Sequence, residues 1–320
     1  MSPSYLELYR NAKLDEVIDR VYRLLESCAI CPRLCRVNRL KDKKGFCRTG
    51  LKPKVYAAFP HYGEEPPISG DRGSGTIFFS NCNLRCIYCQ NYRFSQKGEG
   101  REIEIQELAE LMLKLQEKGC HNINLVTPTH VMPQILSALK SAISGGLEIP
   151  IVYNTSGYEL PEIIKNLEGI VDIYLADMRY ADSAMAGKYS GADNYPRYNR
   201  ASIKEMHRQV GIAKINKEGI IESGLIIRHL VLPHNISGTH QILRFIAEEL
   251  SEETYVSLMS QYLPCHKAGA DPQLNRRITE EEYSQAIKVR ENCGLYNGWI
   301  QEARGSESLA GINIKSNIGS

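Results

Sequence analysis

The stretch TIFFSNCNLRCIYCQN, residues 76–91, joins a short apolar run to three closely spaced cysteines. Cys82, Cys86 and Cys89 are separated there by gaps of three and two residues. Disulfides use cysteines in pairs, and a closed structural zinc site has four ligands, so three cysteines complete neither. Three thiolates can instead bind three irons of a cubane [4Fe–4S] cluster, which leaves the fourth iron open for a small molecule.

The composition of the whole chain is that of a balanced globular protein. It has 320 residues, of which 42% are hydrophobic, with 39 basic and 37 acidic residues. This length predicts one large domain with an appendage. The near-neutral charge indicates no nucleic-acid partner, and no apolar run is long enough to span a membrane.

The N-terminal sequence MSPSYLELYRNAKLDEVIDR lacks the apolar segment of a secretory signal, so we expect a cytoplasmic protein. In a reducing cytoplasm, the ten cysteines are more typical of metal binding or catalysis than of disulfides. Most of them form two groups, and Cys120, Cys265 and Cys293 stand apart. We expect Cys120 and Cys293 to be small buried apolar residues.

From Thr76 onward, short apolar runs alternate with helical patterns. The apolar runs lie at residues 76–80, 123–127, 149–154, 171–177, 225–233 and 254–262. The helical patterns lie near residues 103–118, 132–144, 159–167, 199–213, 238–250 and 279–292. This alternation predicts an α/β fold in which a parallel sheet curls into a barrel or partial barrel with its helices outside.

The sequence also predicts how the chain divides. Residues 1–60 contain an amphipathic helical pattern over 5–27 and a group of four cysteines. Residues 61–75 are rich in turn formers and are predicted to be a linker loop. The barrel occupies residues 76–300, and residues 301–320 lose periodicity and are predicted to be a loose tail.

The loop with three cysteines follows the first predicted strand directly, so it lies at the rim where βα barrels hold their chemistry. Cys82-x3-Cys86-x2-Cys89, with Tyr88 before the third cysteine, resembles the signature of radical S-adenosylmethionine (SAM) enzymes. The resemblance implies a partial (β/α)6 barrel, a [4Fe–4S] cluster on the three cysteines, and SAM on the open iron. It also implies reductive cleavage of SAM to a 5′-deoxyadenosyl radical that abstracts hydrogen from a substrate.

The resemblance extends to the activases of glycyl radical enzymes, such as the pyruvate formate-lyase activating enzyme. Their Asp-Thr-Asn-Gly segment corresponds to NTSG at 154–157, and their Asp-x-Lys to DMR at 177–179. Their strand-five arginine corresponds to Arg228, and their Leu-Pro-x-His to LPCH at 263–266. Such a likeness implies a glycyl radical enzyme as partner and an electron donor such as flavodoxin or ferredoxin.

By this resemblance, Arg228 and Arg179 would neutralise the SAM carboxylate, and Tyr88 would lie against the adenine. Purely structural roles are the alternatives to SAM binding. Arg179 and Asp177 would then form a structural ion pair, and Tyr88 would pack in the loop. The residues assigned to SAM are Tyr88, Thr127, Asn154, Ser156, Asp177, Arg179, Arg228 and His266.

One segment departs from the activase pattern. Activases place Gly-Gly-Glu after strand two to receive the SAM amine, whereas this chain has Thr127, Thr129 and His130 there. A threonine hydroxyl or a carbonyl can accept a hydrogen bond from the amine without the glutamate charge, so Thr127 is our candidate. NINLVTPTH at 122–130, together with the N-terminal cysteines, resembles the PflX-type subgroup of activase-like radical SAM proteins.

The N-terminal cysteines follow the pattern Cys28-x2-Cys31-x3-Cys35-x11-Cys47. Four thiolates suit either a structural zinc or an auxiliary [4Fe–4S] cluster, and the number of ligands does not separate the two. We therefore predict a four-cysteine metal-binding module that holds either zinc or an auxiliary [4Fe–4S] cluster.

Three functions remain open on the sequence. The first is an activase that generates a glycyl radical in a partner protein. The second is a radical SAM enzyme acting on another small molecule or protein, which the missing Gly-Gly-Glu and the extra cysteines favour slightly. The third is a zinc-binding interaction module without catalysis.

Overall fold

The computed structural model describes residues 2–301 and 313–318. Its strands form one large, mostly parallel sheet in the order β10-β9-β8-β6-β5-β4-β2-β1-β3, with β7 paired to β8. The strands are β1 (Lys54–His61), β2 (Ser74–Phe79), β3 (Arg101–Glu102), β4 (Ile123–Val126), β5 (Ile151–Thr155), β6 (Ile173–Asp177), β7 (Lys214–Ile215), β8 (Ile221–Leu230), β9 (Tyr255–Met259) and β10 (Gly298–Ile300).

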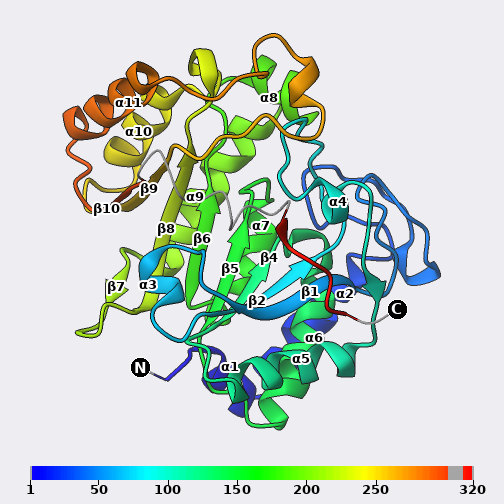
Figure 1. The fold of residues 1–320 in the computed structure, drawn as a ribbon. Helices are drawn as coiled ribbons and strands as arrows, with labels where there is room; N and C mark the ends of the chain where they lie inside the picture. The colour runs from blue at the N-terminus through cyan, green and yellow to red at the C-terminus, as the bar shows by residue number, and fades with distance from the viewer. Residues whose placement is uncertain (1, 302–312, 319–320) are drawn as a thin grey trace.

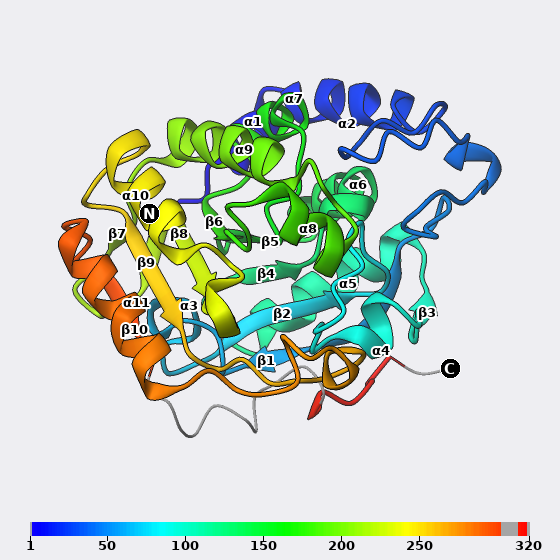
Figure 2. The ribbon, with the colours of Figure 1, turned by 90° about the horizontal axis from the view of Figure 1, so that it is seen from above.

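The run from β2 through β4, β5, β6 and β8 to β9 is parallel throughout. These strands coincide with the apolar runs of the sequence, which confirms an α/β fold with a mostly parallel sheet. Seen from above, the sheet curves as an open arc with helices around its outer side (Figure 2). The carboxyl ends of the parallel strands therefore meet at one edge of the arc.

Helices alternate with the strands along the chain (Figure 1). The helices are α1 (Tyr5–Arg10), α2 (Lys13–Arg23), α3 (Pro66–Ser69), α4 (Tyr92–Ser95), α5 (Ile105–Glu117), α6 (Met132–Ser144), α7 (Pro161–Ile164), α8 (Ser183–Ser190), α9 (Tyr195–Val210), α10 (Thr239–Glu249) and α11 (Glu280–Asn292). Within the described residues, none of these helices combines the length and the apolar character that crossing a membrane requires.

The strands bury both of their faces, because successive side chains point to opposite sides of the sheet. On β5, Ile151 and Tyr153 join the main core against the outer helices, whereas Val152 joins a second cluster on the concave face. Tyr174 and Ile173 divide in the same way on β6. The concave face consequently carries a separate set of side chains, which includes the polar residues of the candidate site.

The N-terminal helix predicted over residues 5–27 is two helices in the structure. Helix α1 ends at Arg10, and Ala12 adopts a left-handed conformation with φ 56° before α2 begins at Lys13. Ser4 anchors the segment, because its amide and hydroxyl donate to Asp172 Oδ1 at 2.9 and 2.8 Å. The break lets the chain follow the outer side of the arc.

The segment before the parallel strands differs from the predicted division at residue 60. That boundary falls inside β1, which pairs antiparallel with β2 from Val55↔Phe79 to His61↔Ser74. The connection that follows, residues 62–70, is hereafter the plug. Ile68 of the plug packs on the concave face of the sheet with Val152 and other buried residues. The segment predicted to be a linker loop therefore packs inside the curve of the sheet.

Part of the predicted loose tail is bound to the sheet, while residues 302–312 and 319–320 lie outside the described residues. Ile314 packs with Phe78 and Tyr56, whose hydroxyl donates to its carbonyl at 3.0 Å. Asn317 accepts from the Ala58 amide at 2.9 Å and donates to the Ala58 carbonyl at 2.7 Å. Residues 313–318 thus continue the hydrogen bonding of β1 along its outer edge.

We predict that Asn317→Ala weakens this attachment. Losing two hydrogen bonds to a partly exposed backbone should lower the free energy of unfolding by about 1 kcal/mol. Amide hydrogen exchange should also rise at Ala58. Lys315→Ala, an exposed neighbour, is the matched control; equal exchange at Ala58 in both variants would contradict the attachment.

Candidate active site

The cysteine loop begins where β2 ends, at the carboxyl edge of the sheet. Each of its sulfurs has a hydrogen-bonding neighbour. The Leu84 amide donates to Cys82 Sγ at 3.4 Å, and the Ser190 hydroxyl donates to Cys86 Sγ at 2.9 Å. Cys89 Sγ and Ser95 Oγ lie 3.2 Å apart. Hydrogen bonds to sulfur are one of the ways a protein stabilises cluster-bound thiolates.

The three thiols crowd one another in a buried loop. Burial raises the pKa of Cys82 to about 12, and the neighbouring Cys86 and Cys89 raise it further. Burial also raises the pKa of Cys89, again with Cys86 adding to the shift. Three buried thiolates need a strongly positive centre among them, because metal ligation requires their deprotonation. An iron–sulfur cluster on this loop supplies such a centre.

In residues 2–301 and 313–318, no three His, Cys, Asp or Glu side chains are grouped to hold a single metal ion. The finding covers the N-terminal cysteines as well as the cysteine loop.

Several residues with positive φ lie in the loops that follow the parallel strands. Among them, Asn81 (72°) precedes the first loop cysteine, Thr127 (61°) follows β4, Gly157 (71°) follows β5, and His266 (55°) lies beyond β9. A β-branched residue such as Thr127 rarely adopts this conformation. Backbone strain of this kind concentrates at functional sites, so it supports placing the site at this edge.

A buried ion network crosses the concave face beside the loop. Arg228 Nε donates to Asp177 Oδ1 at 2.8 Å, and Arg228 Nη2 donates to Asn154 Oδ1 at 2.6 Å. The other carboxylate oxygen of Asp177, Oδ2, accepts a hydrogen bond from Arg179 Nη2. Burial alone would raise the pKa of Asp177, but Arg228 and Arg179 hold it below its ordinary value. The aspartate is therefore ionised and fixes both arginines.

The loop and the network meet at a cavity of about 170 Å³. Tyr88 and Cys89 line it from the loop, and Asp177, Arg179 and Arg228 line it from the strands. Tyr88 is held edge-on against Tyr262 and Tyr180, with ring centroids 5.9 and 6.4 Å away. The remaining lining residues are Gln90, Asn91, Leu230, Met259, Gln261 and Tyr262.

Other residues that the sequence singled out lie around this cavity without lining it. Asn154 is connected to the cavity only through its hydrogen bond with Arg228. The Thr127 amide in turn donates to the Asn154 carbonyl at 2.9 Å. Ser156 is buried, and its hydroxyl has no partner among the described residues. His266 stacks on Tyr92, with ring centroids 4.8 Å apart. Their contacts to SAM stay predictions.

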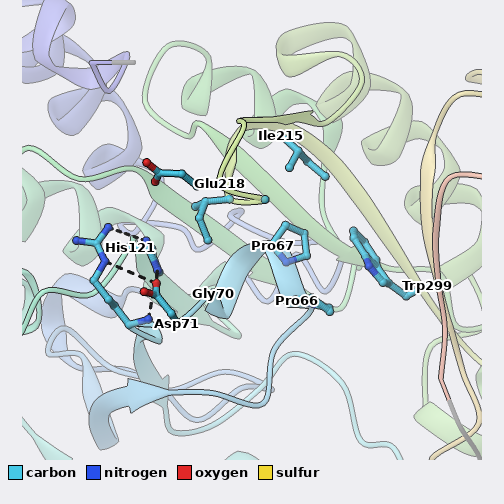
Figure 3. Close-up of a pocket in the computed structure, with 11 residues that line it drawn as sticks. Pro66, Pro67, Gly70, Asp71, His121, Ile215, Glu218 and Trp299 are labelled. Atoms are coloured by element: carbon cyan, nitrogen blue, oxygen red, sulfur yellow. Dashed lines mark hydrogen bonds and ion pairs between the residues drawn. The ribbon is translucent and has the colours of Figure 1, made fainter.

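A larger cavity, of about 780 Å³, lies elsewhere (Figure 3). It opens near the amino ends of the parallel strands, with Asp71 and His121 at one side and Trp299 at the other. His121 Nε2 lies 2.9 Å from Asp71 Oδ1. None of the predicted site residues lines this cavity, so the smaller one beside Cys89 is the candidate active site.

The four N-terminal cysteines lie close to the cysteine loop. Cys28, Cys31 and Cys47 are buried, Cys35 is half-buried, and the Phe46 amide donates to Cys35 Sγ at 3.3 Å. Burial raises the pKa of Cys28, and the nearby Cys47 adds to the shift. Burial also raises the pKa of Cys31, and the neighbouring Cys47 and Cys28 add to the shift. A metal at these cysteines stays a prediction.

Sequence reasoning missed three buried glutamates. Glu64 and Glu65 come from the plug, where turn formers suggested a linker. Glu159 follows β5 and accepts hydrogen bonds from Thr129 Oγ1 at 2.6 Å and Thr155 Oγ1 at 2.5 Å. Glu159 therefore ties the loop after β4 to the end of β5. The one indication of this role in the sequence is that Glu159 lies two residues after the NTSG segment.

The sequence is similar to one known protein family and to two proteins of one organism. The model of a family described as the radical SAM superfamily matches residues 76–246. Uncharacterized protein MJ0674 of Methanocaldococcus jannaschii is 32% identical over 301 residues, which cover 91% of this chain and 82% of that protein. Uncharacterized protein MJ0808 of the same organism is 25% identical over 262 residues, covering 75% of this chain and 71% of that protein.

Solved structures with related folds are more distant. HydG, a maturase of the [FeFe]-hydrogenase, has a TM-score of 0.47 and 14% identity, covering 68% of this chain and 48% of its own. Methylornithine synthase (PylB) has a TM-score of 0.41 and 14% identity, covering 70% of this chain and 69% of its own. This chain thus spans about half the length of HydG.

We predict a pH-dependent stability that Glu159→Gln removes. Burial raises the pKa of Glu159 from 4.5 to about 7, opposed by the hydroxyls of Thr129 and Thr155. The folded state therefore keeps a proton that the unfolded state loses, so stability falls as pH rises from about 4.5 to 7. The loss amounts to roughly 3 kcal/mol.

The measurement is the melting temperature of wild type and Glu159→Gln between pH 5 and 8.5. The variant should become the more stable protein as the pH rises, because its amide still accepts both threonine hydrogen bonds and never ionises. Parallel curves for the two proteins would show that Glu159 does not carry this effect.

Proposed function

Because this chain belongs to the radical SAM superfamily, we propose that it is an activase-like enzyme that abstracts hydrogen from a glycyl radical enzyme. Membership makes it a radical SAM enzyme with a [4Fe–4S] cluster and SAM, rather than a zinc-binding interaction module. The observation that carries the finer proposal is the meeting of the cysteine loop and the Asp177–Arg228 network at one cavity.

The residues at the cavity suit the charged end of SAM. Its carboxylate matches Arg179 and Arg228, whose planar guanidinium groups bind carboxylates with two parallel hydrogen bonds. Its ammonium matches the carboxylate oxygens of Asp177. Since Asp177 already orients both arginines, little side-chain ordering remains to be done when SAM binds.

Cys82, Cys86 and Cys89 would hold the [4Fe–4S] cluster, which would supply the electron for reductive cleavage of SAM and so provide the radical chemistry for hydrogen abstraction from the substrate. The chain's own task is to hold SAM close to the loop and to exclude water. Tyr88, which is buried between Tyr180 and Tyr262, closes one side of the cavity. A flavodoxin or ferredoxin is the proposed electron donor, and the cytoplasm is the proposed location.

The activase role rests on segments that the fold brings to one edge. The NTSG segment ends β5, the DMR segment ends β6, and Arg228 lies opposite Asp177 in the register of β8 and β6. These are the segments that resemble glycyl radical enzyme activases. Their shared location supports the role without identifying the partner.

A second function is favoured by the segment after β4. An activase-type glutamate is absent there, and Thr127 takes a left-handed conformation that glycine adopts at lower cost. The amine end of SAM, or the substrate beyond it, is therefore bound differently than in activases. This difference favours a radical SAM enzyme that acts on another small molecule or protein.

We also propose that Cys28, Cys31, Cys35 and Cys47 hold a second metal centre, either zinc or an auxiliary [4Fe–4S] cluster. The support is their burial next to the cysteine loop. Arg85 donates to the carbonyls of Cys82 and Phe46, and so joins the two cysteine groups.

Single cysteine substitutions should separate the two centres. Ala at Cys82, Cys86 or Cys89 should abolish formation of 5′-deoxyadenosine, because the cluster loses a ligand. Cys28→Ala should instead remove about one quarter to one half of the bound metal and leave the loop cluster in place. Iron, sulfide and zinc analysis of anaerobically purified protein measures both outcomes.

Cys120→Ala is the control, since Cys120 is buried outside both groups. A Cys86→Ala protein that still forms 5′-deoxyadenosine at the wild-type rate would overturn the assignment of the loop.

The activase role is tested by anaerobic incubation with reductant, SAM and candidate glycyl radical enzymes. Activation should produce the electron paramagnetic resonance signal of a glycyl radical in the partner. If SAM is cleaved while every candidate remains silent, the activase role is wrong and the second function stands.

A further inference from the structure

Two carboxylates enter the concave face from the plug. Glu64 and Glu65 precede α3, and both side chains are more than nine-tenths buried, with Glu64 8% and Glu65 6% exposed. Glu64 lies against Arg228 and Asn154, and Glu65 lies beside Ser257 of β9. They therefore sit below the candidate active site, on the side away from the cysteine loop.

The contacts of these carboxylates are incomplete. Glu64 lies 3.3 Å from Arg228 Nη1 and 3.4 Å from Asn154 Nδ2, whereas Arg228 reaches Asp177 and Asn154 at 2.8 and 2.6 Å. Glu65 Oε2 has no partner among the described residues. Asn124 Oδ1, fully buried on the same face, has none there either. Unpaired buried acceptors are costly, so this surface fits a ligand that donates hydrogen bonds.

The charges lead to the same conclusion. In the part of the chain that the structure describes, Glu64, Glu65 and Asp177 lie on the concave face with the guanidinium groups of Arg179 and Arg228, which makes three carboxyl groups and two guanidinium groups. Burial raises the pKa of Glu64 and of Glu65, and Arg228 opposes both shifts. One further cation would neutralise the excess carboxylate and supply the missing donors.

We propose that Glu64, Glu65 and Asn124 form a cation-binding floor that takes an amine or guanidine group of the substrate. The inference rests on the proposed function, because SAM in the cavity beside Cys89 leaves the floor for the molecule that loses hydrogen. Arg228 lines that cavity and also contacts Glu64, so it separates the two sites. When a ligand binds, Arg228 can lose its longer contact to Glu64 and keep its shorter hydrogen bonds to Asp177 and Asn154.

The test measures binding of cationic probes to the anaerobic, cluster-loaded protein with SAM present. The probes are agmatine and a short glycine-rich peptide with one arginine, with glutarate as the anionic comparison. Calorimetry should detect a cationic probe but not glutarate. Glu64→Gln should weaken the binding about tenfold, because it removes a charge-assisted hydrogen bond but keeps the shape.

Glu65→Gln should weaken binding likewise, while Glu218→Gln, an exposed glutamate at the larger cavity, should leave it unchanged. Tighter binding of agmatine indicates a small substrate, and tighter binding of the peptide indicates a polypeptide. The floor is disproved if neither cation binds wild type, if glutarate binds equally, or if Glu64→Gln binds like Glu218→Gln.

Formation of 5′-deoxyadenosine by wild type is followed in parallel. Its absence would overturn the proposed function itself. Its presence without cation binding would overturn only the floor.

Discussion

The ion pair between Asp177 and Arg228 is the contact on which the candidate site depends. These residues are register partners on neighbouring parallel strands, so the sheet itself sets their separation. Asp177 stays ionised because two arginines face it, and through Arg228 the pair reaches Asn154 and Glu64. Breaking a buried pair of this kind leaves an uncompensated charge, so the network holds β5, β6, β8 and the plug in one arrangement.

Much of the fold could be predicted because the parallel strands from β2 to β9 coincide with mainly apolar runs that are followed by a helical period. The strand β1 could not, since it contains Pro60, lies near the sheet edge and leads into the turn formers of the plug. Ile68 looked like part of a loop, yet it packs against Val152 on the concave face. Residues 313–318 were likewise missed because Asn317 binds backbone, and backbone binding leaves no periodic pattern.

For the site, residues that share a local pattern could be predicted and those brought together by the fold could not. The spacing of Cys82, Cys86 and Cys89 is itself the ligand pattern, and the likeness to activase segments indicated Asp177 and Arg228. Glu64 comes from a different part of the chain, so only the packing of the plug shows that it meets Arg228. His266 shows that a matching local motif does not predict every contact of its residues. The motif pointed to His266, but it did not predict that the ring stacks on Tyr92.

The position of the N-terminal cysteines gives them a structural consequence with or without a metal. Arg33 and Arg85 lie 3.7 and 4.4 Å from the ring centroid of Phe46, and Arg33 Nε donates to the Asn83 carbonyl at 2.8 Å. The planar guanidinium of arginine can stack on a ring and donate hydrogen bonds in its own plane at the same time. Phe46 lies next to Cys47, and Asn83 lies next to Cys82, so order in one cysteine group is transmitted to the other. The N-terminal module therefore supports the loop that the superfamily uses for its cluster.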